Sequence, residues 1–171
     1  MSNELKNKIF ISHSGKDKEY VKLLTELLED IGLSETDIFC SSMPGYGIPL
    51  NNNIYDYLSS EFKTNMLIVL YALSDNYYES VACLNEMGAS WVLKNKYTTI
   101  LLPGFEFKNI EGAIDPQKIG IKLDGDLDEL KHRLCEFKDF LINRFNLNII
   151  SPSKWERIRD EFINKVKILM I

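Results

Sequence analysis

The sequence is poor in the side chains that build disulfide frameworks and transition-metal sites. Its 171 residues include three cysteines, an odd number without a C-x-x-C pair, and two histidines, His13 and His132. These counts argue against a disulfide framework, a thiolate metal site, a histidine-based zinc site and a Ser–His–Asp triad. Unpaired cysteines are typical of a reducing cytosol, so we expect a cytoplasmic protein.

Long apolar runs and an excess of positive charge are missing as well. No stretch reaches the ~18 consecutive apolar residues of a membrane span, and the apolar run near the N-terminus is too short for a signal peptide. The formal net charge is -5, with a sequence pI of about 5.1. A broad surface for nucleic acid or for anionic lipid is therefore not expected, and we predict neither partner.

Several motifs of nucleotide-binding proteins and hydrolases are also absent. The chain contains neither the P-loop pattern G-x-x-x-x-G-K-[ST] nor a G-x-S-x-G nucleophile elbow. Gly45 and Gly47 lack the third glycine of the dinucleotide fingerprint. A response regulator would need acidic residues after the first predicted strand and an aspartate ending the third. Here those strands end in Ser12–His13 and Leu73–Ser74.

What the sequence does contain is an ordered alternation of strand and helix patterns. Apolar runs predict strands at Lys8–Ser12, Asp37–Ser41, Asn65–Ser74, Tyr97–Phe105 and Ile119–Asp124. Helical periodicity predicts helices at Asp17–Ile31, Ile54–Phe62, Ser80–Trp91 and Asp126–Phe145, and a last one starting at a Ser153/Glu156 capping signature. This order predicts one α/β domain with about five parallel strands, helices on both faces and an extra C-terminal helix. We place its core at about residues 8–124, with the C-terminal helices at 126–171.

In such sheets ligands bind beyond the carboxyl ends of the strands, which here are followed by polar segments. In the first, His13 and Ser14 precede a predicted helix, and Ser14 with the helix N–H groups can hold a phosphate. Equally, Ser14 can cap the helix, with Asp17 in its first turn. The sequence of this segment leaves both interpretations open.

The second polar segment is a Gly- and Pro-containing loop over residues 42–53. Its residues Gly45 and Gly47 permit close approach of a ligand or a partner chain, and Tyr46 between them offers an aromatic face. The alternative is an ordinary connecting loop, although this one is long for a link between a strand and a helix.

Glu86 is the most unusual residue of the predicted helix Ser80–Trp91. An apolar stripe of Val81, Leu84, Gly88 and Trp91 lies on another face, and the neighbours of Glu86 three and four positions away are all small: Ala82, Cys83, Ala89 and Ser90. A carboxylate with room around it can stabilise the positive charge on a ribosyl carbon when a cationic leaving group such as nicotinamide departs. The alternative is a solvated helix glutamate.

Four segments, in this order and spacing, resemble a bacterial-type TIR (Toll/interleukin-1 receptor) domain: IFISHSGKD, IFCSSMPGYGIP, MLIVLYALSDNYYES and CLNEMGASW. The resemblance covers about residues 8–124 and implies the flavodoxin-like TIR fold. It implies cleavage of the nicotinamide–ribose bond of NAD+, with NAD+ as substrate, no cofactor and Glu86 as the catalytic residue. It further implies substrate-binding roles for His13, Ser14, Ser42, Gly45, Tyr46 and Cys83. The small neighbours of Glu86 would then make room for the nicotinamide ribose.

Two positions depart from the pattern of active TIR enzymes. Ala82 stands where several of them have a tryptophan before the cysteine, and the loop after the first strand lacks the arginines that some carry. Either the pocket is wider here, or another ring such as Tyr46 or Tyr77 covers the ribose.

The resemblance extends to stand-alone TIR NADases of antiphage defence, such as those of Thoeris systems. It implies a cyclic or modified ADP-ribose signal for a separate downstream effector, and self-association through the 42–50 loop. The alternatives are a hydrolase that only depletes NAD+ and a non-catalytic TIR–TIR scaffold.

Overall fold

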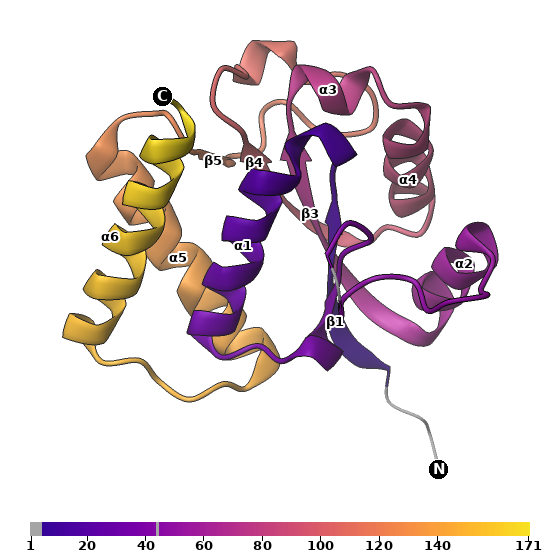
Figure 1. Cartoon of the computed structure of the whole chain (residues 1–171), viewed down its shortest axis with the longest axis horizontal. Helices are drawn as coiled ribbons and strands as arrows, with labels where there is room; N and C mark the ends of the chain where they lie inside the picture. Colours follow the sequence, from indigo (N-terminus) through magenta and orange to yellow (C-terminus); the bar gives the residue numbers. More distant parts are fainter. Residues whose placement is uncertain (1–4, 44) are drawn as a thin grey trace.

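The chain forms a five-stranded parallel sheet with strand order β2-β1-β3-β4-β5 (Figure 1). The computed structural model describes residues 5–43 and 45–171, with the backbone alone at positions 54 and 55. The strands are β1 Lys6–Ser12, β2 Ile38–Phe39, β3 Asn65–Leu73, β4 Lys96–Leu101 and β5 Ile121–Lys122. This topology is flavodoxin-like and confirms the predicted fold class.

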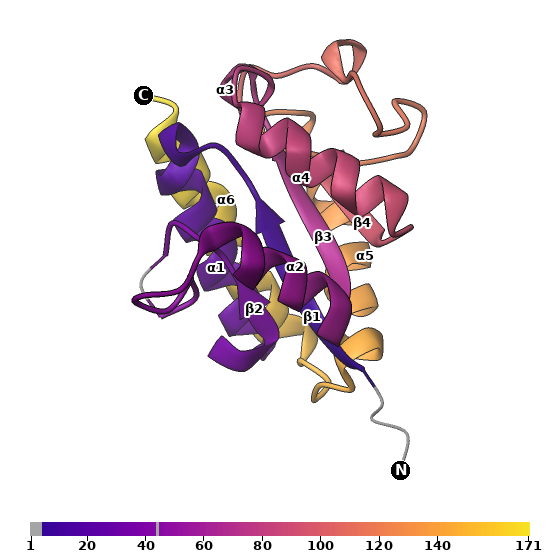
Figure 2. The same cartoon turned by 90° about the vertical axis from the view of Figure 1, so that its right-hand side faces the viewer.

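Helices cover both faces of the sheet, as predicted. They are α1 Lys18–Ile31, α2 Ile54–Thr64, α3 Asp75–Tyr78, α4 Val81–Val92, α5 Leu127–Phe145 and α6 Pro152–Leu169, with 3-10 turns at Gly15–Asp17, Glu35–Asp37 and Phe107–Asn109. Helices α1, α5 and α6 lie on one face, and α2 and α4 on the other (Figures 1 and 2). In the described part of the chain, no helix is long and apolar enough to span a membrane.

β3 is buried on both faces because it lies at the centre of the sheet. Its residues Ile68, Leu70 and Ala72 join the core beneath α1, α5 and α6. The alternate residues, including Tyr71 and Leu73, join a second core beneath α2 and α4. This two-sided burial explains why the strand is apolar without alternation.

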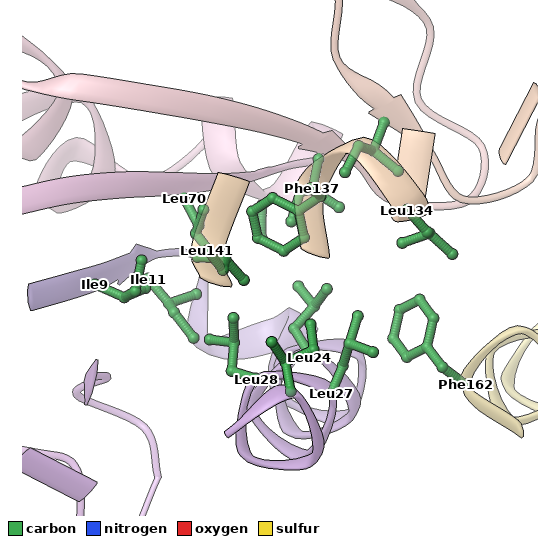
Figure 3. Packing of buried hydrophobic residues seen from close by; sticks show 14 of the residues in the cluster. Ile9, Ile11, Leu24, Leu27, Leu28, Leu70, Leu134, Phe137, Leu141 and Phe162 are labelled. Atoms are coloured by element: carbon green, nitrogen blue, oxygen red, sulfur yellow. The ribbon is translucent and has the colours of Figure 1, made fainter. Parts of the chain in front are cut away.

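The larger core lies between the sheet and the helices α1, α5 and α6. Figure 3 shows Leu24, Leu27 and Leu28 of α1 between the strands and Phe162 of α6. Helix α5 closes the layer with Leu134, Phe137 and Leu141, which are also buried (Figure 3). The buried apolar side chains of these three helices therefore form a single core with the sheet.

Several element boundaries differ from prediction for local reasons. β2 is shorter because the Cys40 N–H donates to the Tyr46 carbonyl in the following loop, at 2.7 Å, instead of continuing the strand. β4 ends at Leu101, before a turn in which Gly104 adopts a φ of +89°. The last helix is capped by Ser151, one residue before Pro152, and not by Ser153 as predicted.

Candidate active site

Glu86 reaches the carboxyl end of β1 from the middle of α4. The Ser12 hydroxyl, at the last position of β1, donates a hydrogen bond to Glu86 Oε2 at 2.6 Å. Among the described residues, Oε1 has no hydrogen-bond partner and is not one of the buried unpaired atoms. One carboxylate oxygen is thus fixed by the sheet, while the other remains for a ligand.

Helix α4 packs on the sheet through a face that its sequence pattern does not suggest. Cys83, Met87 and Ser90 are its buried residues. The apolar stripe faces solvent instead, with 73 % of Val81 and 66 % of Trp91 exposed. Glu86 is next to this buried face on the helix and therefore lies at the boundary between the interior and the solvent.

A cleft of about 520 Å³ lies between α2 and α4, which are neighbours in Figures 1 and 2. Ala82 and Ala89 flank Glu86 in its wall, and their short side chains leave the carboxylate accessible. The volume falls within the usual range of small-molecule sites. The complete lining is Leu58, Ser59, Phe62, Lys63, Ala82, Asn85, Glu86, Ala89 and Leu93.

The environment of Glu86 disfavours its charged form. Burial raises the pKa of Glu86 from 4.5 to about 7, although the hydrogen bond from Ser12 lowers it in part. In the part of the chain that the structure describes, no ion pair neutralises this carboxylate. A carboxyl group in a cleft with a pKa near neutrality is a candidate for catalysis.

His13 and Ser42 lie together at the same edge of the sheet. His13 Nδ1 lies 3.0 Å from the Ile11 carbonyl, and its Nε2 lies 2.6 Å from the Ser42 hydroxyl. Burial lowers the pKa of His13, so the ring is neutral, with Nδ1–H donating to the carbonyl and Nε2 accepting from Ser42. His13 thereby ties the 42–53 loop to β1.

Ser14 caps the first helical turn, which is one of the two roles that the sequence left open. Its hydroxyl accepts a hydrogen bond from the Lys16 N–H at 3.4 Å. Next to it, the buried carboxylate of Asp17 accepts hydrogen bonds from Ser74 at 2.5 Å and Asn76 at 2.8 Å. These bonds link the turn that follows β1 to the segment that follows β3.

The structure does not bring Gly45 and Tyr46 to the Glu86 cleft. The Tyr46 hydroxyl donates to Glu29 on α1, and Gly45, at a φ of +86°, lies beside Glu35. A separate hollow of about 540 Å³ is lined by residues of the same loop: Ser41, Ser42, Met43, Gly45, Gly47, Ile48 and Pro49. In this single chain Tyr46 therefore does not line the Glu86 cleft, and its role as a cover for the ribose stays a prediction.

Two further predicted positions are also corrected. Cys83 is buried on the sheet side of α4, does not line the cleft, and has a thiol pKa that burial raises. Tyr77 is fully buried with its hydroxyl 2.9 Å from Ser12 Oγ, so it lies beneath Glu86 and does not cover the cleft. Both residues lie in the buried layer between Glu86 and the sheet.

Sequence reasoning missed the α2 wall of the cleft, including Phe62 and Lys63. The amphipathic pattern of α2 was the available signal, but only the tertiary packing shows that this helix faces α4. Within residues 5–43 and 45–171, no three His, Cys, Asp or Glu side chains are grouped as metal ligands.

Comparison with known proteins finds a similar protein but does not indicate an activity for this chain. No family model matches the chain. The chain is 44% identical over 166 residues, 97% of its length, to the uncharacterized protein YddK of Bacillus subtilis (strain 168). It spans 59% of the length of that curated relative.

Glu86→Gln should stabilise the fold at alkaline pH. Because the folded pKa of about 7 exceeds the ordinary 4.5, the native state binds more protons between these values, and the free energy of unfolding falls as pH rises through this window. A neutral glutamine has no charged form that burial disfavours, and its amide oxygen can still accept the hydrogen bond from Ser12. We expect a gain of about 2–3 kcal/mol at pH 8 and little change at pH 4.5, measured by urea unfolding.

Glu79→Gln is the matched control for this measurement. Glu79 is exposed and pairs with Lys16 at 3.5 Å on the surface, so its substitution should change stability little at either pH. An equal effect of Glu86→Gln at both pH values would contradict the conclusion that burial disfavours the ionised carboxylate.

Proposed function

We propose that this chain cleaves the nicotinamide–ribose bond of NAD+ as an NAD+ nucleosidase with ADP-ribosyl cyclase activity. The observation that carries the proposal is the Glu86 carboxylate, which is held at Oε2 by Ser12 and belongs to the lining of the α2–α4 cleft. The resemblance of the surrounding segments to bacterial TIR domains supports the same substrate. In the cell, the product would serve as a cyclic or modified ADP-ribose signal in antiphage immunity, read by a separate effector.

One carboxylate is sufficient for this chemistry because the leaving group is already cationic. When the C–N bond breaks, both electrons leave with nicotinamide, which becomes neutral without needing a proton. Positive charge develops on the ribosyl carbon, and the Glu86 carboxylate stabilises it or orients a ribose hydroxyl. Leu58 and Phe62 of α2 give the opposite wall of the cleft an apolar surface.

The fate of the ribosyl carbon separates a cyclase from a hydrolase. Attack by water yields ADP-ribose with one new oxygen, whereas attack by a nitrogen of the same molecule yields a cyclic product with none. Mass spectrometry of the reaction in H₂¹⁸O distinguishes the two by the label in the product. Labelled ADP-ribose as the sole product would replace the signalling function with the simpler NAD+-depleting hydrolase.

A non-catalytic TIR–TIR scaffold is the second candidate, and the exposed face of α4 favours it. Val81, Trp91 and Val92 are each at least 66 % exposed, which is unusual for large apolar side chains on one helix. Such a surface suits contact with another protein chain. An inactive protein that self-associates through this helix would support the scaffold.

Specific activity should rise with protein concentration or on addition of an activating trigger. The Glu86 cleft is open to solvent in the single chain, and Tyr46 of the 42–50 loop bonds Glu29 on α1, so the loop of a neighbouring molecule is the proposed element that closes the cleft. The test is NAD+ turnover per molecule over a dilution series, with light scattering alongside. A monomer with constant specific activity, unchanged by any trigger, would exclude this assembly.

A further inference from the structure

A buried chain of hydrogen-bonding groups leads away from Glu86 on the side opposite the cleft. Ser12 Oγ lies 2.6 Å from Glu86 Oε2 and 2.9 Å from the Tyr77 hydroxyl. The Tyr77 hydroxyl lies 3.1 Å from the Cys83 carbonyl oxygen. Ser12 is 1 % exposed and Tyr77 is fully buried, so water does not compete for these bonds.

Three separate elements hold this chain in place. Ser12 ends β1, at the point where β1 pairs with Tyr71 of β3. Tyr77 lies on α3, whose N-terminus is fixed by Ser74 accepting from the Tyr77 N–H at 3.0 Å. Cys83 lies one turn before Glu86 on α4, so the chain starts and ends on the same helix.

The donors and acceptors fit both protonation states of Glu86. When the carboxylate is ionised, Ser12 donates to Oε2 and the Tyr77 hydroxyl can donate to Ser12 Oγ, so both dipoles point toward the charge. When Oε2 carries the proton, it can donate to Ser12, Ser12 to Tyr77, and Tyr77 to the Cys83 carbonyl. Tyr77 has a single hydroxyl proton, so in the ionised arrangement it turns from the Cys83 carbonyl to Ser12, and in the protonated arrangement it bonds the carbonyl.

We propose that Ser12 and Tyr77 are positioning residues for Glu86, forming a hydrogen-bonded chain that holds Oε2 and directs Oε1 into the cleft. Their importance for catalysis rests on the proposed NAD+ cleavage. Their effect on the carboxylate does not, because it can be measured on the free protein.

The neighbours of Glu86 allow its titration to be observed without interference. The titratable groups that face it are Cys40 after β2, Tyr71 on β3, Tyr77 on α3, Cys83 on α4 and Lys63 on α2. Burial raises the pKa of both thiols and of both tyrosines, that of Tyr71 to about 12. These four groups therefore stay neutral across the range in which Glu86 titrates.

The test is a ¹³C NMR titration of the glutamate side-chain carboxyl carbons, with the Glu86 signal assigned by its loss in Glu86→Gln. Ser12→Ala removes the donor to the charged form and should raise the pKa of Glu86 by about one unit. Tyr77→Phe acts through Ser12 and should raise it by a smaller amount, roughly 0.3–0.5 units. Phenylalanine keeps the buried ring, so this variant should fold even if Ser12→Ala does not.

Tyr78→Phe is the matched control, because this neighbouring tyrosine of α3 bonds the Glu111 carbonyl at 3.1 Å and not the chain. It should leave the Glu86 titration unchanged. If Tyr77→Phe also leaves it unchanged, the proposed chain is wrong. If Tyr77→Phe shifts the Glu86 titration but the wild-type protein does not cleave NAD+, the hydrogen-bonded chain is upheld and the proposed function is rejected. In an active enzyme, the pH midpoint of kcat/KM should move upward with the NMR value.

Discussion

Glu86→Gln should lower kcat for NAD+ cleavage by on the order of 100-fold or more, with little change in KM. Glutamine keeps the shape of the side chain and can still accept the hydrogen bond from Ser12, but it carries no negative charge. The positive charge on the ribosyl carbon develops only in the transition state. Without the Glu86 charge the transition state is less stable, so the chemical step slows while substrate binding changes little. The measurement is steady-state NAD+ consumption at pH 8, where the wild-type carboxylate is ionised.

The control for this experiment is again Glu79→Gln. Glu79 is an exposed residue at the end of α3 whose partner is a surface lysine, so its removal should leave turnover unchanged. Near-normal turnover by Glu86→Gln would reject the catalytic assignment and make the TIR–TIR scaffold the better account.

Removing α6 should unfold the protein. Five of its side chains are buried against α1 and α5: Trp155, Ile158, Phe162, Ile163 and Val166. Burial of each contributes roughly 1.5–3 kcal/mol, and together this is comparable to the ~5–15 kcal/mol that stabilises a typical domain. A chain ending at residue 150 should therefore show no cooperative thermal transition by circular dichroism.

A single substitution tests the same packing more quantitatively. Phe162→Ala should cost about 3–5 kcal/mol in urea unfolding, because it opens a cavity between α6 and the α1 leucines (Figure 3). Ile168→Ala, on the same helix but 68 % exposed, is the control and should cost less than about 0.5 kcal/mol. Equal urea midpoints for the two variants would mean that α6 does not contribute to the stability of the domain.

Much of the fold could be predicted because long periodic segments carry their own signal. The central strand β3 was evident from an apolar run without alternation, and α1 and α6 from their apolar faces. Short elements were less predictable. β2 has two residues because a loop carbonyl, that of Tyr46, competes for the Cys40 N–H, and such a contact leaves no periodic pattern.

The candidate site was predictable only in part. Glu86 stood out because its helical neighbours are small, which is a local property of the sequence. Its partner Ser12 is 74 positions away, and the opposite wall of the cleft comes from α2, so tertiary packing alone brings them together. The direction of Tyr46 was also beyond the sequence, because it depends on Glu29 of a different element.

The central claim is that this chain breaks the nicotinamide–ribose bond of NAD+ at Glu86. The most direct measurement is nicotinamide release, followed by mass spectrometry, from NAD+ incubated with concentrated wild-type protein and with folded Glu86→Gln. The account predicts nicotinamide together with ADP-ribose or a cyclic ADP-ribose from the wild type, and at least a 100-fold lower rate from the variant. Equal nicotinamide release by the two proteins, or none from an assembled wild type supplied with its trigger, would contradict it.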